Sequence, residues 1–116
     1  MSEFPWLKFY TSSVDKQVDY KAYSSVIDLF DESVKKFGDS IAYECMGKTM
    51  SFRELDRLSA QFSNYLTQHL KLDKGARVAI QMPNVLQYPV VMFGALRAGM
   101  VVVNTNPLYT PSEMKH

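Results

Sequence analysis

Residues 77–113 constrain the fold most, because they predict a strand, a helix, a second strand and the start of another helix. Residues 77–82 and 101–103 are short apolar runs with β-branched side chains. Residues 86–98 between them have the length of a helix, which Gly99 ends. Two strands joined by a helix of about a dozen residues form a βαβ unit with parallel strands. The sequence therefore predicts an α/β fold.

Residues 110–113 carry the signature of a helix N-terminus. Thr110 is a preferred N-cap residue, Pro111 is favoured at the first helical position, and Glu113 completes a capping box. This predicted helix begins only a few residues before His116, the last residue of the sequence. We therefore expect the chain to be part of a longer protein.

An amphipathic helix is predicted over residues 26–37. Ser25 is placed to cap its start, and Gly38 is expected to end it in a left-handed conformation. The spacings of Asp31 to Lys35 and of Glu32 to Lys36 predict two ion pairs on its polar side. Its apolar face is formed by Ile27, Phe30, Val34 and Phe37.

A β-hairpin follows this helix. Residues 41–46 alternate as a strand does, Gly47 supports a turn, and residues 48–50 return. The only cysteine of the chain, Cys45, then lies in the first strand. We expect it to be a small buried side chain rather than a reactive thiol, because free cysteine is among the most buried residue types.

A second amphipathic helix starts after the hairpin. Ser51 and Glu54 are spaced as a capping box, the strongest helix start in the chain. His69 lies in the last turn, where the helix dipole favours a cation. Apolar residues recur at helical spacing: Leu55, Leu58, Phe62, Leu66 and Leu70.

The first 23 residues are predicted to form an arm in front of a domain that covers residues 24–116. The arm is rich in aromatic residues, namely Phe4, Trp6, Phe9 and Tyr10. We expect these side chains to dock on the surface of the domain. The alternative is contact with a membrane or a partner subunit, because Trp and Tyr suit interfaces that are partly apolar and partly wet.

The composition excludes several classes of protein. With 47% hydrophobic and 22% charged residues the chain is typical of a globular domain, and its net charge of +1 gives no basis for nucleic-acid binding. A single cysteine excludes an intramolecular disulfide and favours a reducing compartment. The first residues lack the pattern of a signal peptide, and the longest apolar stretch, residues 90–103, is too short to span a bilayer. We therefore predict a cytoplasmic location.

No catalytic, cofactor-binding or metal-binding residue is predicted. The glycine-rich loops that bind nucleotide phosphates are missing, as are a nucleophile elbow and a histidine–glutamate metal pattern. His69 and His116 have no nucleophile or second ligand at a useful spacing. Asn104, Asn106 and Tyr109 follow the second strand of the βαβ unit, where α/β folds bind ligands, but we favour a turn-forming polar loop there.

The helix of the βαβ unit is predicted to be buried on more than one side. Residues 90–96 include no polar side chain, which is typical of a helix that is packed all round. Two other helices and a hairpin are too few to cover this helix and both faces of a parallel sheet. Because each large apolar side chain left bare costs about 1.5–3 kcal/mol, we expect further segments of a longer protein to cover these faces. The isolated chain is then expected to be marginally stable, aggregated or oligomeric.

Five stretches carry a family resemblance. They are residues 50–57 (MSFRELDR), 74–80 (KGARVAI), 82–89 (MPNVLQYP), 93–100 (FGALRAGM) and 103–111 (VNTNPLYTP). Together they resemble bacterial long-chain fatty-acid–CoA ligases, which belong to the adenylate-forming, or AMP-binding, superfamily. The resemblance extends over essentially the whole chain.

The resemblance implies that the chain is the first part of the large N-terminal domain of such an enzyme, with a β-hairpin, two amphipathic helices and a parallel βαβ unit. Enzymes of this family use ATP and magnesium to convert a fatty acid into an acyl-adenylate, and then transfer the acyl group to coenzyme A. Their phosphate loop, magnesium motif, ribose-binding aspartate and catalytic lysine match no residue up to His116. The chain alone is therefore expected to be inactive and to bind none of these cofactors.

The resemblance also implies partners for the full-length enzyme, namely a fatty acid, ATP and CoA. The family acts at the cytoplasmic face of the membrane, and some members are dimers, so peripheral membrane contact and a homodimer both fit the aromatic arm. One alternative is a free-standing structural or dimerisation module derived from such an enzyme. Another is a small nucleotide-binding α/β domain, which the missing glycine-rich loop disfavours.

Overall fold

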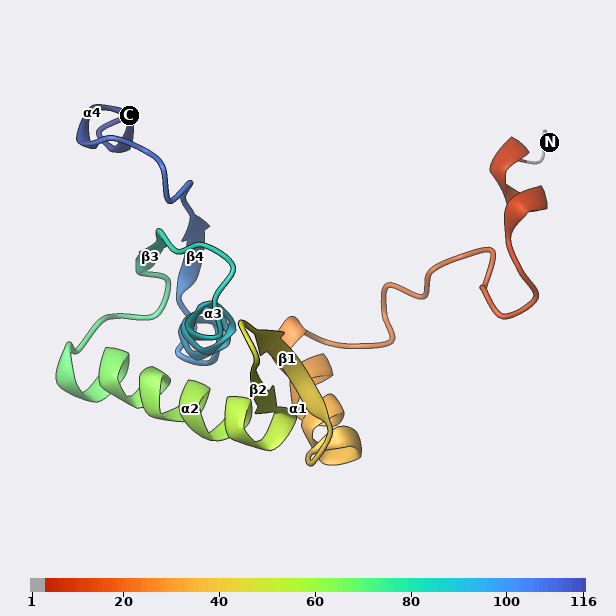
Figure 1. Cartoon of the computed structure of the whole chain (residues 1–116), viewed down its shortest axis with the longest axis horizontal. Helices are drawn as coiled ribbons and strands as arrows, with labels where there is room; N and C mark the ends of the chain where they lie inside the picture. The colour runs from red at the N-terminus through yellow and green to blue at the C-terminus, as the bar shows by residue number, and fades with distance from the viewer. Residues whose placement is uncertain (1–3) are drawn as a thin grey trace.

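The computed structural model describes residues 4–116, whose path is shown in Figure 1. The described helices are α1 (Val26–Phe37), α2 (Phe52–Asn64), α3 (Gln87–Arg97) and the short α4 (Pro111–Met114). A 3₁₀ helix, η1 (Pro5–Phe9), precedes them, and a π-helical segment, η2 (Tyr65–His69), extends α2. The described strands are β1 (Ile41–Cys45), β2 (Lys48–Ser51), β3 (Arg77–Ile80) and β4 (Val101–Asn104).

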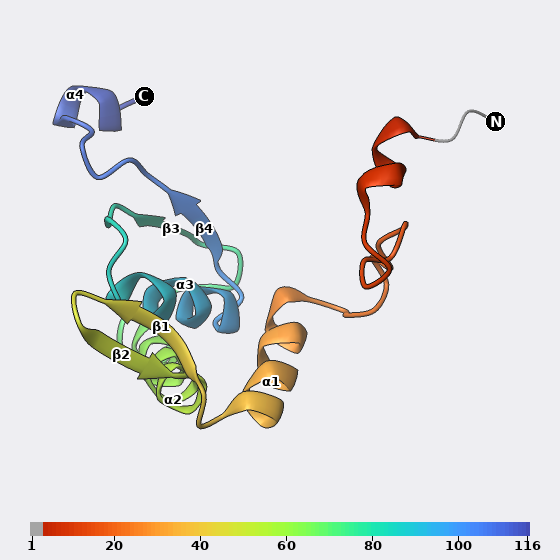
Figure 2. The same cartoon turned by 45° about the vertical axis from the view of Figure 1, so that its right-hand side comes forward.

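Helix α3 lies at the centre of the body, with α2 on one side and the β3–β4 sheet on the other (Figures 1 and 2). Two clusters of buried apolar side chains hold these layers together. The first cluster contains Phe30, Met50 and Leu55. The second contains Leu66, Ala95 and Met100. The core therefore joins α1, the hairpin, α2 and α3 to the start of β4.

The βαβ unit predicted from the sequence is confirmed. β3 and β4 are parallel, with Arg77 beside Val101 at the start of the ladder. β3 stops short of the predicted boundary at residue 82, and β4 extends to Asn104. Gly99 ends α3 as predicted, since its φ of +74° is left-handed and the next N–H donates to the carbonyl of Ala95 at 2.9 Å.

Helix α1 has the predicted bounds, and the hydroxyl of Ser25 caps it by accepting the N–H of Asp28 at 3.0 Å. The prediction for Gly38 is wrong, because this residue keeps a right-handed conformation with φ of −41°. A Cβ at Gly38 would lie 2.8 Å from Nη2 of Arg53. Gly38 is therefore not a left-handed cap, and its nearest side-chain neighbour is the flexible end of an exposed arginine.

The ion pair predicted for Asp31 within α1 is replaced by one between helices. Asp31 Oδ1 accepts a hydrogen bond from Nη2 of Arg97 at 3.0 Å. In the described part of the chain no ion pair joins Asp31 to Lys35 or Glu32 to Lys36. The side chain of Arg97 is only 18% exposed. An acidic side chain on α1 reaches this cation because α1 packs beside the end of α3.

The hairpin is confirmed, with β1 and β2 antiparallel. Met46 and Gly47 form its turn with φ of +52° and +74°, the sign that a two-residue type I′ turn requires at both positions. The hydroxyl of Ser51 accepts the N–H of Glu54 at 3.1 Å, which is one half of the predicted capping box. The return bond is absent from the described residues, and the backbone of Ser51 belongs to the ladder as the partner of Ile41.

The arm does not dock on the domain, so that expectation is wrong. Residues 4–25 extend away from the body, with η1 far from α2 and α3 in both views (Figures 1 and 2). Its aromatic side chains stay exposed, Phe9 to 77%. Phe4 stacks on Trp6 with ring centroids 4.7 Å apart, so the arm packs on itself. The first three residues of the predicted arm lie outside the described residues.

The central helix is covered better than the sheet. Every residue from 88 to 100 is buried or half-buried, which confirms that α3 packs on more than one side. In contrast, Val101 and Val103 on β4 are 48% and 39% exposed. Among the helices of the described residues, none combines the length and the apolar character that a bilayer crossing requires.

Candidate functional site

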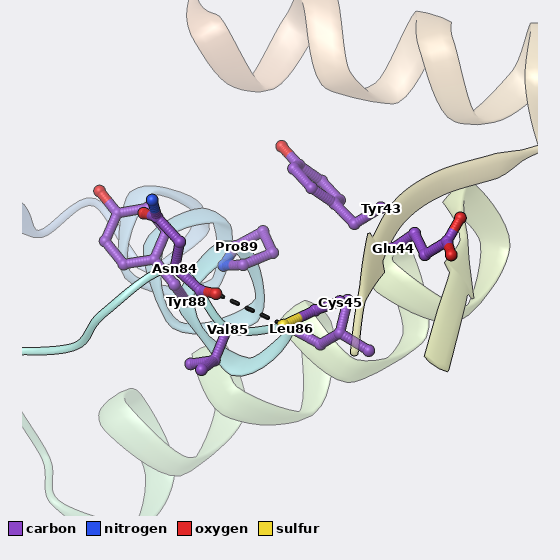
Figure 3. A pocket seen from close by; sticks show the side chains of 8 residues that line it. All are labelled: Tyr43, Glu44, Cys45, Asn84, Val85, Leu86, Tyr88 and Pro89. Carbon is purple, nitrogen blue, oxygen red and sulfur yellow. Dashed lines mark hydrogen bonds between the residues drawn. The ribbon is translucent and has the colours of Figure 1, made fainter. Parts of the chain in front are cut away.

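A cavity with a volume of about 330 Å³ lies between β1 and the start of α3 (Figure 3). Its walls are mainly apolar, and they come from two segments that the hairpin and the βαβ unit bring together. The lining side chains are Tyr43, Glu44, Cys45, Asn84, Val85, Leu86, Tyr88 and Pro89.

Cys45 is part of this wall and is half-buried, so the expectation of a buried side chain is wrong. β1 belongs to a sheet of only two strands, and Cys45 lines a cavity between this strand and the start of α3. The thiol donates to the backbone carbonyl of Asn84 at 3.5 Å, as the dashed line in Figure 3 shows. This contact ties the hairpin to the loop before α3.

The polar groups around the cavity do not form a catalytic arrangement. The hydroxyl of Tyr88 donates to Oδ1 of Asn104 at 2.7 Å and so joins the start of α3 to the end of β4. Glu44 lines the cavity, but the thiol of Cys45 donates to the carbonyl of Asn84 instead. Nucleophilic catalysis requires a base within hydrogen-bond reach of the nucleophile, which is not found at Cys45 in the described residues.

The loop after β4 is held by turn contacts. Oδ1 of Asn106 accepts the N–H of Leu108 at 2.9 Å, which is the Asx turn that this residue type favours. Nε2 of Gln81 donates to the carbonyls of Asn106 and Tyr109, each at 3.3 Å. The loop therefore has the turn-forming structure that the sequence favoured.

A second cavity, of about 300 Å³, opens at the carboxyl end of the β3–β4 sheet. The structure brings Asn104 and Tyr109 together there, whereas Asn106 is not part of its wall. Glu113 also lines it, but its carboxylate is used by the cap of α4. The backbone N–H and the hydroxyl of Thr110 donate to Oε2 of Glu113 at 2.8 and 2.9 Å and lower the pKa of this carboxyl group. The capping box predicted at residues 110–113 is thus complete.

The two histidines lie apart and serve no common site. His69 is the last residue of η2 and stacks on Tyr65, with ring centroids 5.1 Å apart. His116 lines the cavity at the end of the sheet. Across residues 4–116, no group of three His, Cys, Asp or Glu side chains is placed to hold a metal ion.

The contacts of Tyr88 and Gln81 were not predicted from the sequence. Each joins segments that lie more than a dozen residues apart, as the separations of 16 and 25 residues to Asn104 and Asn106 show. Local patterns report neighbours along one helix or strand, whereas these pairs depend on how the βαβ unit closes. No motif in the sequence indicates them.

Comparison with known proteins agrees with this architecture. A profile described as AMP-binding enzyme matches residues 30–116. The chain is 50% identical over 111 residues to the long-chain-fatty-acid–CoA ligase of Yersinia pestis, covering 96% of this chain and 20% of that protein. It is 46% identical to the ligase of the same name from Haemophilus influenzae, over 95% of this chain and 20% of that protein. The chain thus spans about a fifth of the length of these relatives.

A solved structure shares the fold. The N-terminal subdomain of NpsA from Klebsiella oxytoca superposes with a TM-score of 0.74 and 26% identity, over 78% of this chain and 24% of that one. The fold is therefore the α/β arrangement expected for the N-terminal part of an adenylate-forming enzyme. With the profile covering α2, both sheets and the βαβ unit, this chain belongs to the AMP-binding enzyme family.

Proposed function

We propose that this chain forms the first part of the large N-terminal domain of a long-chain fatty-acid–CoA ligase. The observation that carries the proposal is the 50% identity, over 96% of the chain, to the Yersinia pestis protein of that name. The parallel βαβ unit and the similarity to the NpsA subdomain support its place in the large domain. The full-length enzyme uses ATP, magnesium and CoA to activate a fatty acid and transfer it as an acyl group.

Within that enzyme the role of this chain is structural. Residues 24–116 build the first layers of the domain, and residues 1–23 are an arm in front of it. In the described residues no carboxylate cluster suits magnesium, and the sequence has no glycine-rich loop that suits the phosphates of ATP. We propose that the groups that bind magnesium and the phosphates of ATP lie in other parts of the enzyme.

A chimeric ligase tests the proposal. The matching fifth of the Yersinia pestis ligase is replaced by this chain, and formation of acyl-CoA from palmitate is measured with ATP, magnesium and CoA. We expect activity within about tenfold of the parent enzyme, because the transplanted segment preserves packing and carries no reacting group. A folded chimera that binds ATP but makes no acyl-CoA contradicts the proposal.

Titration of the chain alone is the matched control. We expect no tight binding of ATP with magnesium and no turnover of palmitate. Micromolar affinity for ATP identifies the chain instead as an independent nucleotide-binding domain and overturns the assignment of a structural role.

For the arm we propose reversible contact with the inner face of the cytoplasmic membrane. Trp6 is 50% exposed and Phe9 77% exposed, and Nζ of Lys8 lies 5.1 Å from the centroid of the Phe9 ring. Exposed aromatic rings beside a cation suit the interface of an anionic bilayer. The alternative is that the same side chains bind a second copy of the chain, as a dimerisation module does.

The fluorescence of Trp6 separates these two outcomes, because it is the only tryptophan of the chain. With vesicles of phosphatidylglycerol and phosphatidylethanolamine, membrane contact shifts the emission to the blue, and Phe9→Ser weakens the effect. Leu108→Ser, at an exposed apolar position outside the arm, is the control and leaves the shift unchanged. A blue shift that depends on protein concentration without vesicles supports the dimer, and no shift in either case removes both roles.

A further inference from the structure

Helices α2 and α3 form the tightest contact in the body. Ser59 and Leu55 on α2 and Gly94 and Ala95 on α3 are all buried. A Cβ at Gly94 would lie 2.8 Å from both the ring of Phe62 and the carbonyl of Ser59, so the two backbones approach closely. We therefore expect α2 and α3 to stay packed together when other parts of the body unfold locally.

Helix α1 is attached much more lightly. Of its residues only Phe30 is buried, and its ring stacks on Phe93 of α3 with centroids 4.2 Å apart. Val26 at one end and Phe37 at the other are 57% and 44% exposed. In Figure 2, α1 lies at the margin of the body, between the arm and the hairpin. A helix with so few buried apolar contacts belongs to the low-stability part of a fold.

Arg97 holds α1 to the other two helices. From the last turn of α3, its Nη2 donates to Oδ1 of Asp31 on α1 at 3.0 Å and also to Oδ1 of Asp56 on α2. Its Nη1 donates to the carbonyl of Asp56 at 3.0 Å and to the hydroxyl of Ser59 at 3.4 Å. The guanidinium carbon lies 5.5 Å from the centroid of the Phe30 ring. The side chain of Arg97 thus contacts both Phe30 and Asp31 of α1 while it is hydrogen-bonded to α2.

The two ends of α1 are held differently. At its C-terminal end, the N–H of Arg53 donates to the carbonyl of Gly38 at 2.9 Å, and the N–H of Phe52 donates to that of Ser40 at 3.1 Å. These backbone bonds fix the connection to the start of α2. At its N-terminal end, α1 continues into the arm, which extends from the body (Figure 1). Residues 38–40 therefore stay attached to α2, and α1 would turn about this attachment point.

We propose that Arg97 is an ionic latch for α1: the helix and its attached arm open from α2 and α3 as one unit about residues 38–40, and the Asp31–Arg97 pair sets how often they do. This inference does not rest on the proposed ligase activity. The α2–α3 pair stays closed in the open state, because the close contact of Gly94 with Ser59 and Phe62 does not involve α1. Opening moves the arm by moving the helix that carries it.

Amide hydrogen exchange, followed by mass spectrometry peptide by peptide, tests the latch in the full 116-residue chain. Asp31→Asn is expected to speed exchange in α1 by about threefold to tenfold, since it replaces a charge-assisted hydrogen bond that is partly screened by water. Exchange in α2 and α3 is expected to change less than twofold. Arg97→Lys, which keeps the charge but loses the fork of donors, is expected to speed exchange in α1 as well. The exchange is measured at a protein concentration at which sedimentation velocity shows a monomer, because self-association through α1 would also slow its exchange.

Glu32→Gln is the matched control, because it removes one negative charge from the next, exposed position of α1. It is expected to leave exchange in α1 within twofold. Raising the salt concentration to screen charges should speed exchange in α1 of the unchanged chain but not of Asp31→Asn. The latch is contradicted if Asp31→Asn and Glu32→Gln behave alike, or if salt and Asp31→Asn speed exchange in all three helices by the same factor.

Discussion

Gly94 sets how closely α2 and α3 pack, and a single methyl group there tests the contact. In Gly94→Ala the new Cβ meets the carbonyl of Ser59 at 2.8 Å, which the backbone of α2 relieves only by moving. We expect a loss of about 1–3 kcal/mol in the free energy of unfolding, as for other overpacked cores. Urea unfolding followed by circular dichroism, at equal protein concentration, measures it.

Gly38→Ala is the comparison for this prediction. Its Cβ also meets an atom at 2.8 Å, but that atom is the flexible end of the exposed Arg53 side chain, and its next neighbour, the carbonyl of Val34, is at 3.1 Å. We expect a smaller loss than for Gly94→Ala. Equal losses at the two positions argue against close backbone packing as the reason for Gly94.

The carboxyl group of Glu113 allows a pH-dependent test of the cap of α4. The N–H and hydroxyl of Thr110 donate to its carboxylate and lower its pKa below the ordinary value. A lowered pKa in the folded state means that the cap stabilises α4 above the unfolded-state pKa, and that this contribution is lost as the pH falls through the folded-state pKa. Carboxyl carbon chemical shifts should show the pKa of Glu113 rising in Thr110→Ala. The backbone N–H of residue 110, which is the larger cause, is kept in that variant, so an unchanged pKa refutes the contribution of the Thr110 hydroxyl.

At the scale of elements, the hairpin turn carries a residue that its conformation disfavours. Met46 has φ of +52° and is 95% exposed, so it is strained and makes few contacts. Asn suits the first position of a type I′ turn that continues with glycine. Met46→Asn should therefore raise the free energy of unfolding by about 0.5–1 kcal/mol. Met46→Val, which tolerates positive φ poorly, should lower it, and a gain for Val or a loss for Asn contradicts the turn assignment.

The elements were predictable where the signal is local. Ser25, Gly99 and Thr110 each mark a helix end that the structure confirms, because caps depend on residues a few positions apart. Gly38 was assigned wrongly because it stays right-handed and its carbonyl accepts the N–H of Arg53, which is distant in the sequence. The cavity beside Cys45 and the partners of Arg97 depend in the same way on how helices meet, which no local pattern encodes.

The position of the arm was also not predictable from the sequence. Its aromatic residues suggested docking on the domain, since large apolar side chains are often covered. In the structure they stay exposed instead, and Phe4 finds its partner in Trp6. Composition identified the arm as a separate segment but did not show what it contacts.

The whole molecule is more extended than a chain of its length needs to be. Its radius of gyration is 17.9 Å, whereas a compact domain of about 100 residues has about 13 Å. Part of this comes from the arm, and part from a body in which β4 and α1 keep apolar side chains in water, Val101 to 48%. Such faces fit the interior of a larger domain. This agrees with the comparison, because the chain spans only about a fifth of the length of its relatives.

Sedimentation velocity combined with urea unfolding of the isolated 116-residue chain tests this central claim most directly. If the exposed faces of β4 and α1 are meant to be covered by the rest of a ligase domain, the chain alone should self-associate and unfold over a broad range of urea, because exposed apolar patches associate and a thin core unfolds with little cooperativity. A monodisperse monomer that unfolds in one steep transition contradicts the account.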